Sequence, residues 1–171
     1  KNLFKEINLS KYKTVIFTSS TSIYQLNNEL VDETSAISTD TRSIALNRVE
    51  TFILEQSNSC YILRLSGICG YSRLSQSKLN QPTVDHSNLP VNLIHVDDIV
   101  SVIYQLFIRP QQDKDIINVS CLEHPSKKKY YQHLCHKFQL KQPQFNSSSK
   151  KYKKISPFKL TKKYHISLKF N

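Results

Sequence analysis

The chain has 171 residues, of which 39% are hydrophobic, so it is long enough to bury a core and is most simply a single domain. No apolar run approaches the ~18 residues that a membrane span needs, and no signal-peptide pattern opens the chain, so we expect a cytoplasmic protein without a membrane partner. The four cysteines show no C-x-x-C spacing, which favours reduced structural thiols.

The net charge of +11 is concentrated at one end of the chain. Residues 124–171 contain 13 lysines and no acidic residue, whereas residues 1–123 hold 11 Lys and Arg against 13 Asp and Glu. Such a block is typical either of a nucleic-acid-binding surface or of a solvated protein face. Because the lysines lie among apolar and aromatic residues that fit core positions, and because arginine is absent, we favour the solvated face and do not expect a nucleic-acid partner. These residues are Tyr130, Tyr131, Leu134, Phe138, Phe158 and Leu160.

Predicted strands and helices alternate from the start of the chain. Residues 2–9 fit the last turns of a helix, and the β-branched run at 14–20 predicts a buried parallel strand. Helical periodicity then covers residues 38–55, and the apolar run at 60–65 predicts a second buried strand. This alternation is typical of a parallel β/α architecture.

The alternation continues in the second half. A short strand is expected at 91–96, followed by a helix over 99–108 with Asp97 as its N-cap and Asp98 in its first turn. The remaining predicted elements are a strand at 115–120, a helix that opens at Pro125-Ser126, a linker over 146–154, a short helix at 157–163 and a strand at 165–170.

Both glycines of the chain, Gly67 and Gly70, lie in one segment, ILRLSGICGYSR at 62–73. At average usage a chain of this length would hold roughly a dozen glycines, so this pair marks a backbone site where a side chain would not fit. The segment follows a predicted strand, at the position where open α/β sheets bind ligands, so we predict a ligand-facing turn. No G-x-G-x-x-G is present, and the pattern resembles the second half of a doubly wound domain.

Five segments, in a fixed order, resemble the extended short-chain dehydrogenase/reductases of the NAD-dependent epimerase/dehydratase type, in particular an atypical branch of that family. The resemblance implies the C-terminal part of a Rossmann-like doubly wound parallel sheet with a small α+β substrate-side segment. Residues 1–123 would be the second half of an NAD(P)-binding domain, and residues 124–171 a basic helix/strand segment. The matching segments are SSTSIY at 19–24, TRSIALNRVE at 41–50, LRLSGICGYSR at 63–73, VNLIHVDD at 91–98 and KKISPFKL at 153–160.

The resemblance also implies a reaction type and its catalytic positions. Active enzymes of the wider group use a Tyr-x-x-x-Lys pair for proton transfer during hydride transfer to the nicotinamide, and these two positions are Arg42 and Leu46 here. Arginine stays protonated and leucine carries no charge, so neither can perform the acid–base step. Ser20, with Thr21 beside it, matches the hydroxyl that orients the substrate oxygen; the alternative is that it satisfies local backbone groups. The candidate catalytic positions are Ser20, Thr21 and Arg42.

The same resemblance places Ser19, Arg64 and Gly67 on the cofactor side, with Gly67 where the chain passes the nicotinamide. A charged residue inside a strand needs a partner, and we favour Arg64 as a brace to Asp97 or Asp98 over a cofactor contact.

On the substrate side the resemblance implies Tyr24, Asn92 and His95, although an architectural role at the strand end is the alternative for His95. No metal site is expected, because the candidate donors His133, Cys135 and His136 are spaced i, i+2 and i+3 on one helix and do not converge on one ion with a fourth ligand.

These features together predict an NAD(P)-binding, epimerase/dehydratase-like protein in a truncated or degenerate form. Complete relatives would use NAD or NADP and a nucleotide-sugar or other small-molecule substrate, and the helix over 38–55 would form a homodimer interface. This chain alone would show no measurable dinucleotide binding, and a sheet cut after its first strands would be poorly soluble. The missing Tyr-Lys pair leaves open whether the chain is an enzyme. The alternatives are a non-enzymatic scaffold or binding protein, and nucleic-acid binding through residues 124–171.

Overall fold

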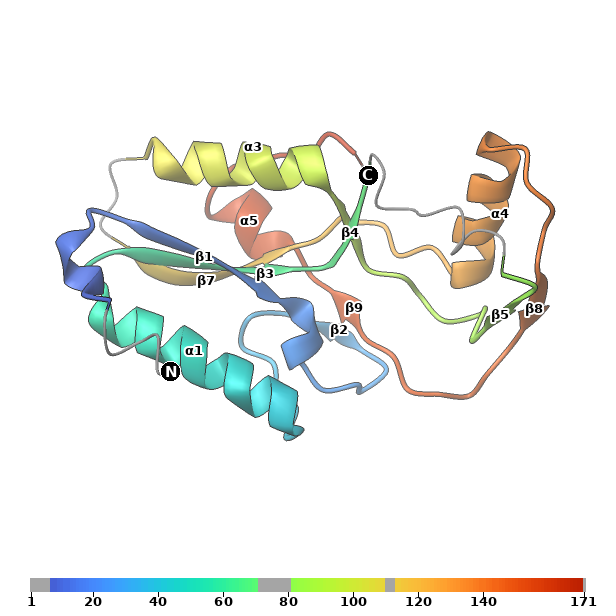
Figure 1. Cartoon of the computed structure of the whole chain (residues 1–171), viewed down its shortest axis with the longest axis horizontal. Coiled ribbons are helices and arrows are strands. Elements are labelled where there is room, and N and C mark those ends of the chain that lie inside the picture. Colours follow the sequence, from blue (N-terminus) through green and yellow to red (C-terminus); the bar gives the residue numbers. More distant parts are fainter. Residues whose placement is uncertain (1–6, 71–80, 110–112, 171) are drawn as a thin grey trace.

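The computed structural model describes residues 7–70, 81–109 and 113–170. A parallel sheet lies at its centre, with strand order β1-β3-β7 (Figure 1). These strands are β1 (Val15–Ser20), β3 (Cys60–Leu65) and β7 (Lys114–Val119), paired in register over their whole length. Their carboxyl ends therefore lie along one edge of the sheet, and the predicted α/β fold is confirmed.

Helices cover both faces of this sheet (Figure 1). Alternate side chains of β3 point to opposite faces, as expected for a strand. Cys60 and Ile62 pack with Ile53 of α1 (Thr41–Gln56) on one face. Leu63 lies on the other face, in a core shared with α3 (Val96–Phe107) and α5 (Phe158–Lys162). All six residues of β3 are buried, which explains why its sequence is apolar except at Arg64.

The helix starts differ from the predicted ones because of their caps. Asp40 caps α1 by accepting a hydrogen bond from the Ser43 backbone N–H at 3.0 Å, so the helix begins at Thr41 rather than at residue 38. In α3 the prediction of Asp97 as N-cap is wrong. The cap is His95, whose Nδ1 accepts from the Asp97 backbone N–H at 3.2 Å, so the helix begins at Val96.

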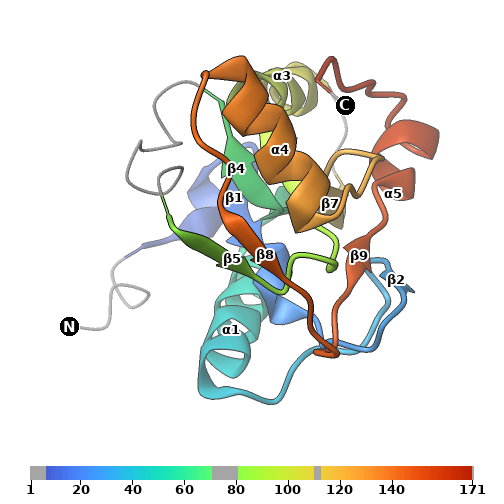
Figure 2. The same cartoon turned by 90° about the vertical axis from the view of Figure 1, so that its right-hand side faces the viewer.

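A second group of short parallel pairs lies beyond the main sheet, together with α4 (Lys127–Lys137) (Figure 2). The predicted strand at 91–96 is reduced to three residues, and the helix expected after Pro125-Ser126 is confirmed, with Ser126 as its N-cap. The sequence did not predict the partners of these pairs, which are too short to show periodicity. The pairs are β2 (Leu30–Val31) with β9 (Lys154–Ile155), β4 (Gly67–Cys69) with β6 (Leu93–His95), and β5 (Thr83–Asp85) with β8 (Gln144–Asn146).

The strand predicted at 165–170 does not form, although the short helix before it does. The buried carboxylate of Asp98 accepts hydrogen bonds from the Lys169 and Phe170 backbone N–H groups, at 2.8 and 3.1 Å. Ile166 is 1% exposed within the core next to α3. Two backbone N–H groups of this segment thus find their acceptor at the N-terminus of α3 rather than on a neighbouring strand.

The two glycines serve close packing. The predicted turn at Gly67 is wrong, because Gly67 begins β4 and donates its N–H to the Asn92 carbonyl oxygen at 2.9 Å. Gly70 has a φ of +103°, and a Cβ there would collide with the His95 ring.

Residues 71–73 of the same motif and residues 2–6 of the predicted first helix lie outside the described residues. Leu9–Lys11, at the end of that predicted helix, forms a 3₁₀ turn, η2. All four cysteines are free thiols, as predicted.

Candidate functional site

A pocket of about 360 Å³ lies at the carboxyl end of β1, beside the first half of α1. The chain leaves β1 through the 3₁₀ turn η3 (Thr21–Ile23), and this places a row of hydroxyl groups opposite the helix. In parallel α/β sheets this edge is where ligands bind. The lining residues are Thr18, Ser19, Ser20, Arg42, Ala45, Leu46 and Val49.

The hydroxyl groups predicted at this site have different local partners. Ser20 Oγ accepts a hydrogen bond from the Ser22 backbone N–H at 3.1 Å and so caps η3, which matches the local alternative for this residue. Its own hydroxyl proton stays available to a ligand. Thr21 Oγ1 donates to the Leu65 carbonyl oxygen at 3.2 Å, and Ser19 donates to the Glu50 carboxylate. Thr21 and Ser19 therefore serve the fold.

Arg42 and Leu46, the two positions assigned to the Tyr-Lys pair, line the same pocket from α1. Arg42 is exposed, and within the described part of the chain no acidic group forms an ion pair with its guanidinium. Leu46 is partly buried and packs against the cluster around Ile23 and Tyr24. The pocket thus combines a fixed cation and a hydroxyl group with an apolar wall, and neither α1 residue can act as a general base.

Arg64 is buried in the core, and the predicted pairing with Asp97 or Asp98 is wrong. Its guanidinium forms a buried ion pair with Glu50 of α1, with Nη2 to Oε2 at 2.7 Å and Nε within 3.2 Å of both carboxylate oxygens. The side chains of Arg64 and Glu50 are 2% and 1% exposed. A brace is present, but it joins the central strand to α1 rather than to α3.

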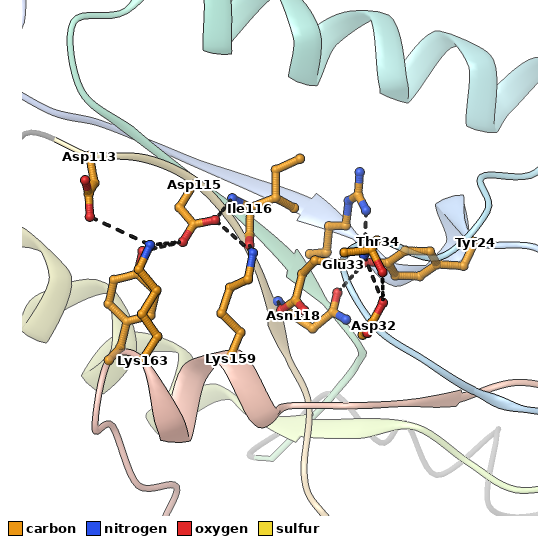
Figure 3. A network of polar contacts seen from close by, with 12 residues as sticks. Tyr24, Asp32, Glu33, Thr34, Asp113, Asp115, Ile116, Asn118, Lys159 and Lys163 are labelled. Carbon is orange, nitrogen blue, oxygen red and sulfur yellow. Dashed lines mark hydrogen bonds and ion pairs between the residues drawn. The ribbon is translucent and has the colours of Figure 1, made fainter.

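Tyr24 extends this buried network toward β7. Its hydroxyl accepts from Arg64 Nη1 at 2.9 Å and donates to Asn118 Oδ1 at 2.7 Å, so it is oriented into the core. Burial, opposed by Arg64, raises the pKa of Tyr24 to about 12. The backbone N–H of Asn118 donates to Glu33 Oε1 at 2.7 Å, which covers the outer edge of β7 at that point (Figure 3).

A second polar cluster covers the same edge of β7 nearer its start. Asp115 accepts from Lys159 at 2.9 Å, Lys163 at 2.8 Å and the Tyr164 hydroxyl at 2.7 Å (Figure 3). Burial favours the protonated acid, but these three donors outweigh it and hold the pKa of Asp115 below its usual value. Lys159 also donates to the Ile116 carbonyl oxygen at 2.8 Å. Side chains therefore occupy backbone groups of β7 that a further strand would need for pairing.

The structure does not bring Gly67, Asn92 and His95 to the lining of the pocket. Asn92 holds β9, because its Nδ2 donates to the Lys153 carbonyl oxygen and its Oδ1 accepts from the Ile155 backbone N–H. His95 stacks on the Phe170 ring with centroids 4.0 Å apart. The structure thus gives His95 the architectural contacts of the alternative interpretation.

Glu50 is the residue that the sequence analysis missed. It occupies a helical stripe with Leu46 and Ile53, where an acidic residue among apolar positions indicates a buried partner. Lys153 was also overlooked: it donates to the carbonyl oxygens of Ser22 and Tyr24, and burial lowers its pKa.

In the described residues no three His, Cys, Asp or Glu side chains gather to hold a metal ion. None of the helices described is long and apolar enough to cross a membrane.

A parallel sheet with helices on both faces and a pocket at its strand ends defines a Rossmann-like α/β protein. No protein-family model matches the sequence. The protein YeeZ of Escherichia coli (strain K12) is 30% identical over 136 residues, which cover 78% of this chain and 49% of YeeZ. The chain thus spans about half the length of the curated relatives it matches.

Solved structures agree with this fold. A functionally unknown conserved protein from Silicibacter pomeroyi matches with a TM-score of 0.81 and 21% identity, over 95% of this chain and 64% of that one. The UDP-glucuronic acid 4-epimerase from Bacillus cereus, solved in complex with NAD, matches with a TM-score of 0.80 and 14% identity, over 99% and 60% of the two chains. The chain has the fold of the NAD-dependent epimerases and dehydratases of the short-chain dehydrogenase/reductase superfamily, and it matches only part of the length of these neighbours.

Proposed function

We propose that the chain is part of an NAD(P)-binding, epimerase/dehydratase-like protein that binds a nucleotide-sugar or related small molecule without the usual acid–base pair. The pocket at the carboxyl end of β1 is the observation that carries this proposal. Ser20 and Arg42 would orient the ligand there, and Leu46 would contribute apolar contact. Residues 1–123 would supply the dinucleotide side, and residues 124–171 would complete the substrate side.

The residues present account for only part of a dinucleotide site. The nicotinamide end would lie near Ser20 and Gly67, but the 171 residues contain no G-x-G-x-x-G turn to hold a pyrophosphate. NAD or NADP, when bound, would supply hydride acceptor or donor chemistry. On the protein side, Arg42 holds a fixed positive charge and the Ser20 hydroxyl can donate one hydrogen bond. These groups bind and orient a ligand and cannot remove a proton from it.

Calorimetric titration of NADH and NADPH tests this proposal in two proteins. The chain alone is expected to show no measurable heat of binding. A fusion to the part of YeeZ that this chain does not match is expected to bind with micromolar affinity, and Arg42→Ala in that fusion should weaken binding. Micromolar affinity of the isolated chain would contradict the proposal, and so would a folded fusion that fails to bind.

A non-enzymatic scaffold is the second candidate, and the absence of a Tyr-Lys pair at Arg42 and Leu46 favours it over a working oxidoreductase. The fusion distinguishes the two. A scaffold would fold and give a sharp thermal transition, but neither dinucleotide would raise its melting temperature. A homodimer through α1 remains part of the proposal and is tested by sedimentation of the same fusion.

A further inference from the structure

The outer edge of β1 is open for pairing with a further strand. In a parallel sheet, the N–H and C=O groups of successive residues point alternately to one neighbouring strand and to the other. Val15 donates its N–H to the Ser59 carbonyl oxygen, so Ile16 and Thr18 turn their backbone groups away from β3. Within the described part of the chain, no hydrogen bond reaches the backbone groups of Ile16 or Thr18.

The outer edge of β7, at the other side of the same sheet, is closed. Its outward-facing groups belong to Ile116 and Asn118. The Ile116 N–H donates to the Asp115 carboxylate at 2.8 Å, and its carbonyl oxygen accepts from Lys159 at 2.8 Å. The Asn118 N–H donates to Glu33 at 2.7 Å. A further strand can therefore join at β1, whereas at β7 it would have to displace these contacts.

The helix α3 carries an exposed apolar stripe. Val100, Tyr104 and Phe107 are 61%, 63% and 69% exposed. Their spacing of four and then three residues places them on one face of the helix. No charged residue occurs in β1 or at positions 99–108 of the sequence. A contiguous exposed apolar surface of this kind marks an interaction site, and its lack of charge favours an apolar partner over a polyanion.

The stripe lies on the flank of α3 that faces away from the C-terminal segment. Asp98 and Phe107 are nine residues, or about two and a half turns, apart, so they lie on opposite sides of α3. Asp98 accepts from the backbone of Lys169 and Phe170, in the segment that follows α5. In turn, α5 contacts the outer edge of β7 through Lys159. Figure 2 shows α5 on the β7 side of the sheet and β1 on the other side. The stripe and the open edge therefore belong to the same side of the molecule.

The chain that could cover both features is present in the relatives. The matched residues cover 49% of YeeZ, so about half of that protein has no matching residues here. A strand parallel to β1 needs a crossover connection, usually a helix, and parallel sheets carry helices on both faces. A single βα unit thus provides both a strand for the β1 edge and a helix for the α3 stripe.

We propose that the outer edge of β1 and the α3 stripe (Val100, Tyr104 and Phe107) together dock a βα unit from the unmatched part of a YeeZ-like protein. Its strand extends the sheet parallel to β1, and its helix packs on the stripe. Thr18 and Ser20 line the candidate pocket, so the docked strand also borders that pocket. This inference rests on the proposed function, because both treat the chain as one part of a longer fold.

Amide hydrogen exchange, followed residue by residue by NMR without any dinucleotide, tests the open edge. In the 171-residue chain, the Ile16 and Thr18 amides should exchange at least about tenfold faster than the Phe17 amide, which points toward β3. In the fusion to the part of YeeZ that this chain does not match, both amides should exchange at least about tenfold more slowly than in the chain alone. Phe17 is the internal control and should change less.

A pair of variants tests the helix side of the surface. Tyr104→Gln/Phe107→Gln should lower the melting temperature of the fusion by about 4 °C more than that of the chain alone, because the two rings are buried only in the fusion. The control, Leu122→Gln/Phe158→Gln, removes two exposed apolar side chains outside the stripe and should affect the two proteins equally. Far-ultraviolet circular dichroism confirms that each variant is folded.

Three outcomes would overturn the proposal. One is slow exchange of the Ile16 and Thr18 amides in the chain alone, with sedimentation showing whether a second copy covers them. Another is a fusion in which both amides exchange as fast as in the chain alone. The third is an equal loss of melting temperature in the two proteins for Tyr104→Gln/Phe107→Gln.

The same fusion separates this proposal from the proposed function. If both amides are protected but no dinucleotide binds, the docking surface is supported and only the proposed function is contradicted. If a dinucleotide binds while both amides stay unprotected, the docking surface is contradicted and the proposed function is supported.

Discussion

The buried network between α1 and β3 and the open pocket at the end of β1 are neighbours, and Ser19 belongs to both. In the network, Arg64 and Glu50 are almost fully buried and satisfy each other. In the pocket, Arg42 is exposed, and the described residues offer it no ion-pair partner. The difference shows which polar groups are paired inside the protein and which stay available to a ligand.

The largest expected effect comes from breaking the buried pair. Glu50→Ala leaves the Arg64 guanidinium buried without its counterion, so the free energy of unfolding should fall by about 3–5 kcal/mol. Urea unfolding, followed by circular dichroism, measures this change.

A double variant is the control for that prediction. In Glu50→Leu/Arg64→Met no charge remains buried, so the double variant should be more stable than Glu50→Ala by at least about 1 kcal/mol. If the two proteins unfold at the same urea concentration, the loss in the single variant does not come from an uncompensated charge.

Tyr24→Phe should have an intermediate effect on stability. It removes the hydroxyl that links Arg64 to Asn118, so we expect a loss of about 1–3 kcal/mol at pH 8 by urea unfolding. Leu46→Ala is a less informative change, because it alters the pocket wall as well as the core.

The same variant carries a pH prediction. The pKa of Tyr24 is raised to about 12 in the folded protein, against about 10 in the unfolded chain. The folded state thus holds the phenol proton longer, so stability is intact below about pH 10 and falls as the pH rises toward 12. Tyr24→Phe should lose less stability than the parent protein between about pH 9 and pH 11. Parallel curves for the two proteins would contradict the assigned pKa.

Arg42→Ala should have the smallest effect on stability. The side chain is exposed and has no ion-pair partner among the described residues, so the free energy of unfolding should change by less than about 0.5 kcal/mol. Arg48→Ala, at another exposed position of α1, is the matched control. A loss above about 1 kcal/mol for Arg42→Ala alone would mean that the pocket residue supports the fold.

The sequence predicted the main sheet well because its strands are long and buried. The strand Cys60–Leu65 is buried on both faces and apolar except at Arg64, as expected for a central parallel strand. The strand at 165–170 was predicted on similar local grounds and did not form. Its backbone partner is the Asp98 carboxylate on α3, and no local pattern reveals a contact between such distant positions.

The candidate site was predicted in part. Ser20 and Arg42 do lie on one pocket, as the order of motifs implied. Asn92 and His95 lie outside its lining, because contacts with β9 and Phe170 occupy their side chains. The glycine pair was interpreted as a ligand-facing turn, yet Gly70 is required by the His95 ring that packs against it.

By itself, the sequence determined the parallel α/β class, the order of the main elements and the loss of the Tyr-Lys pair, because periodicity and residue type are local properties. Only the tertiary structure decided that Arg64 pairs with Glu50, and that Lys159 and Lys163 pair with Asp115. A charge finds its partner through distances in the folded chain. Residues 14 or 44 positions apart show no such distance in their sequence.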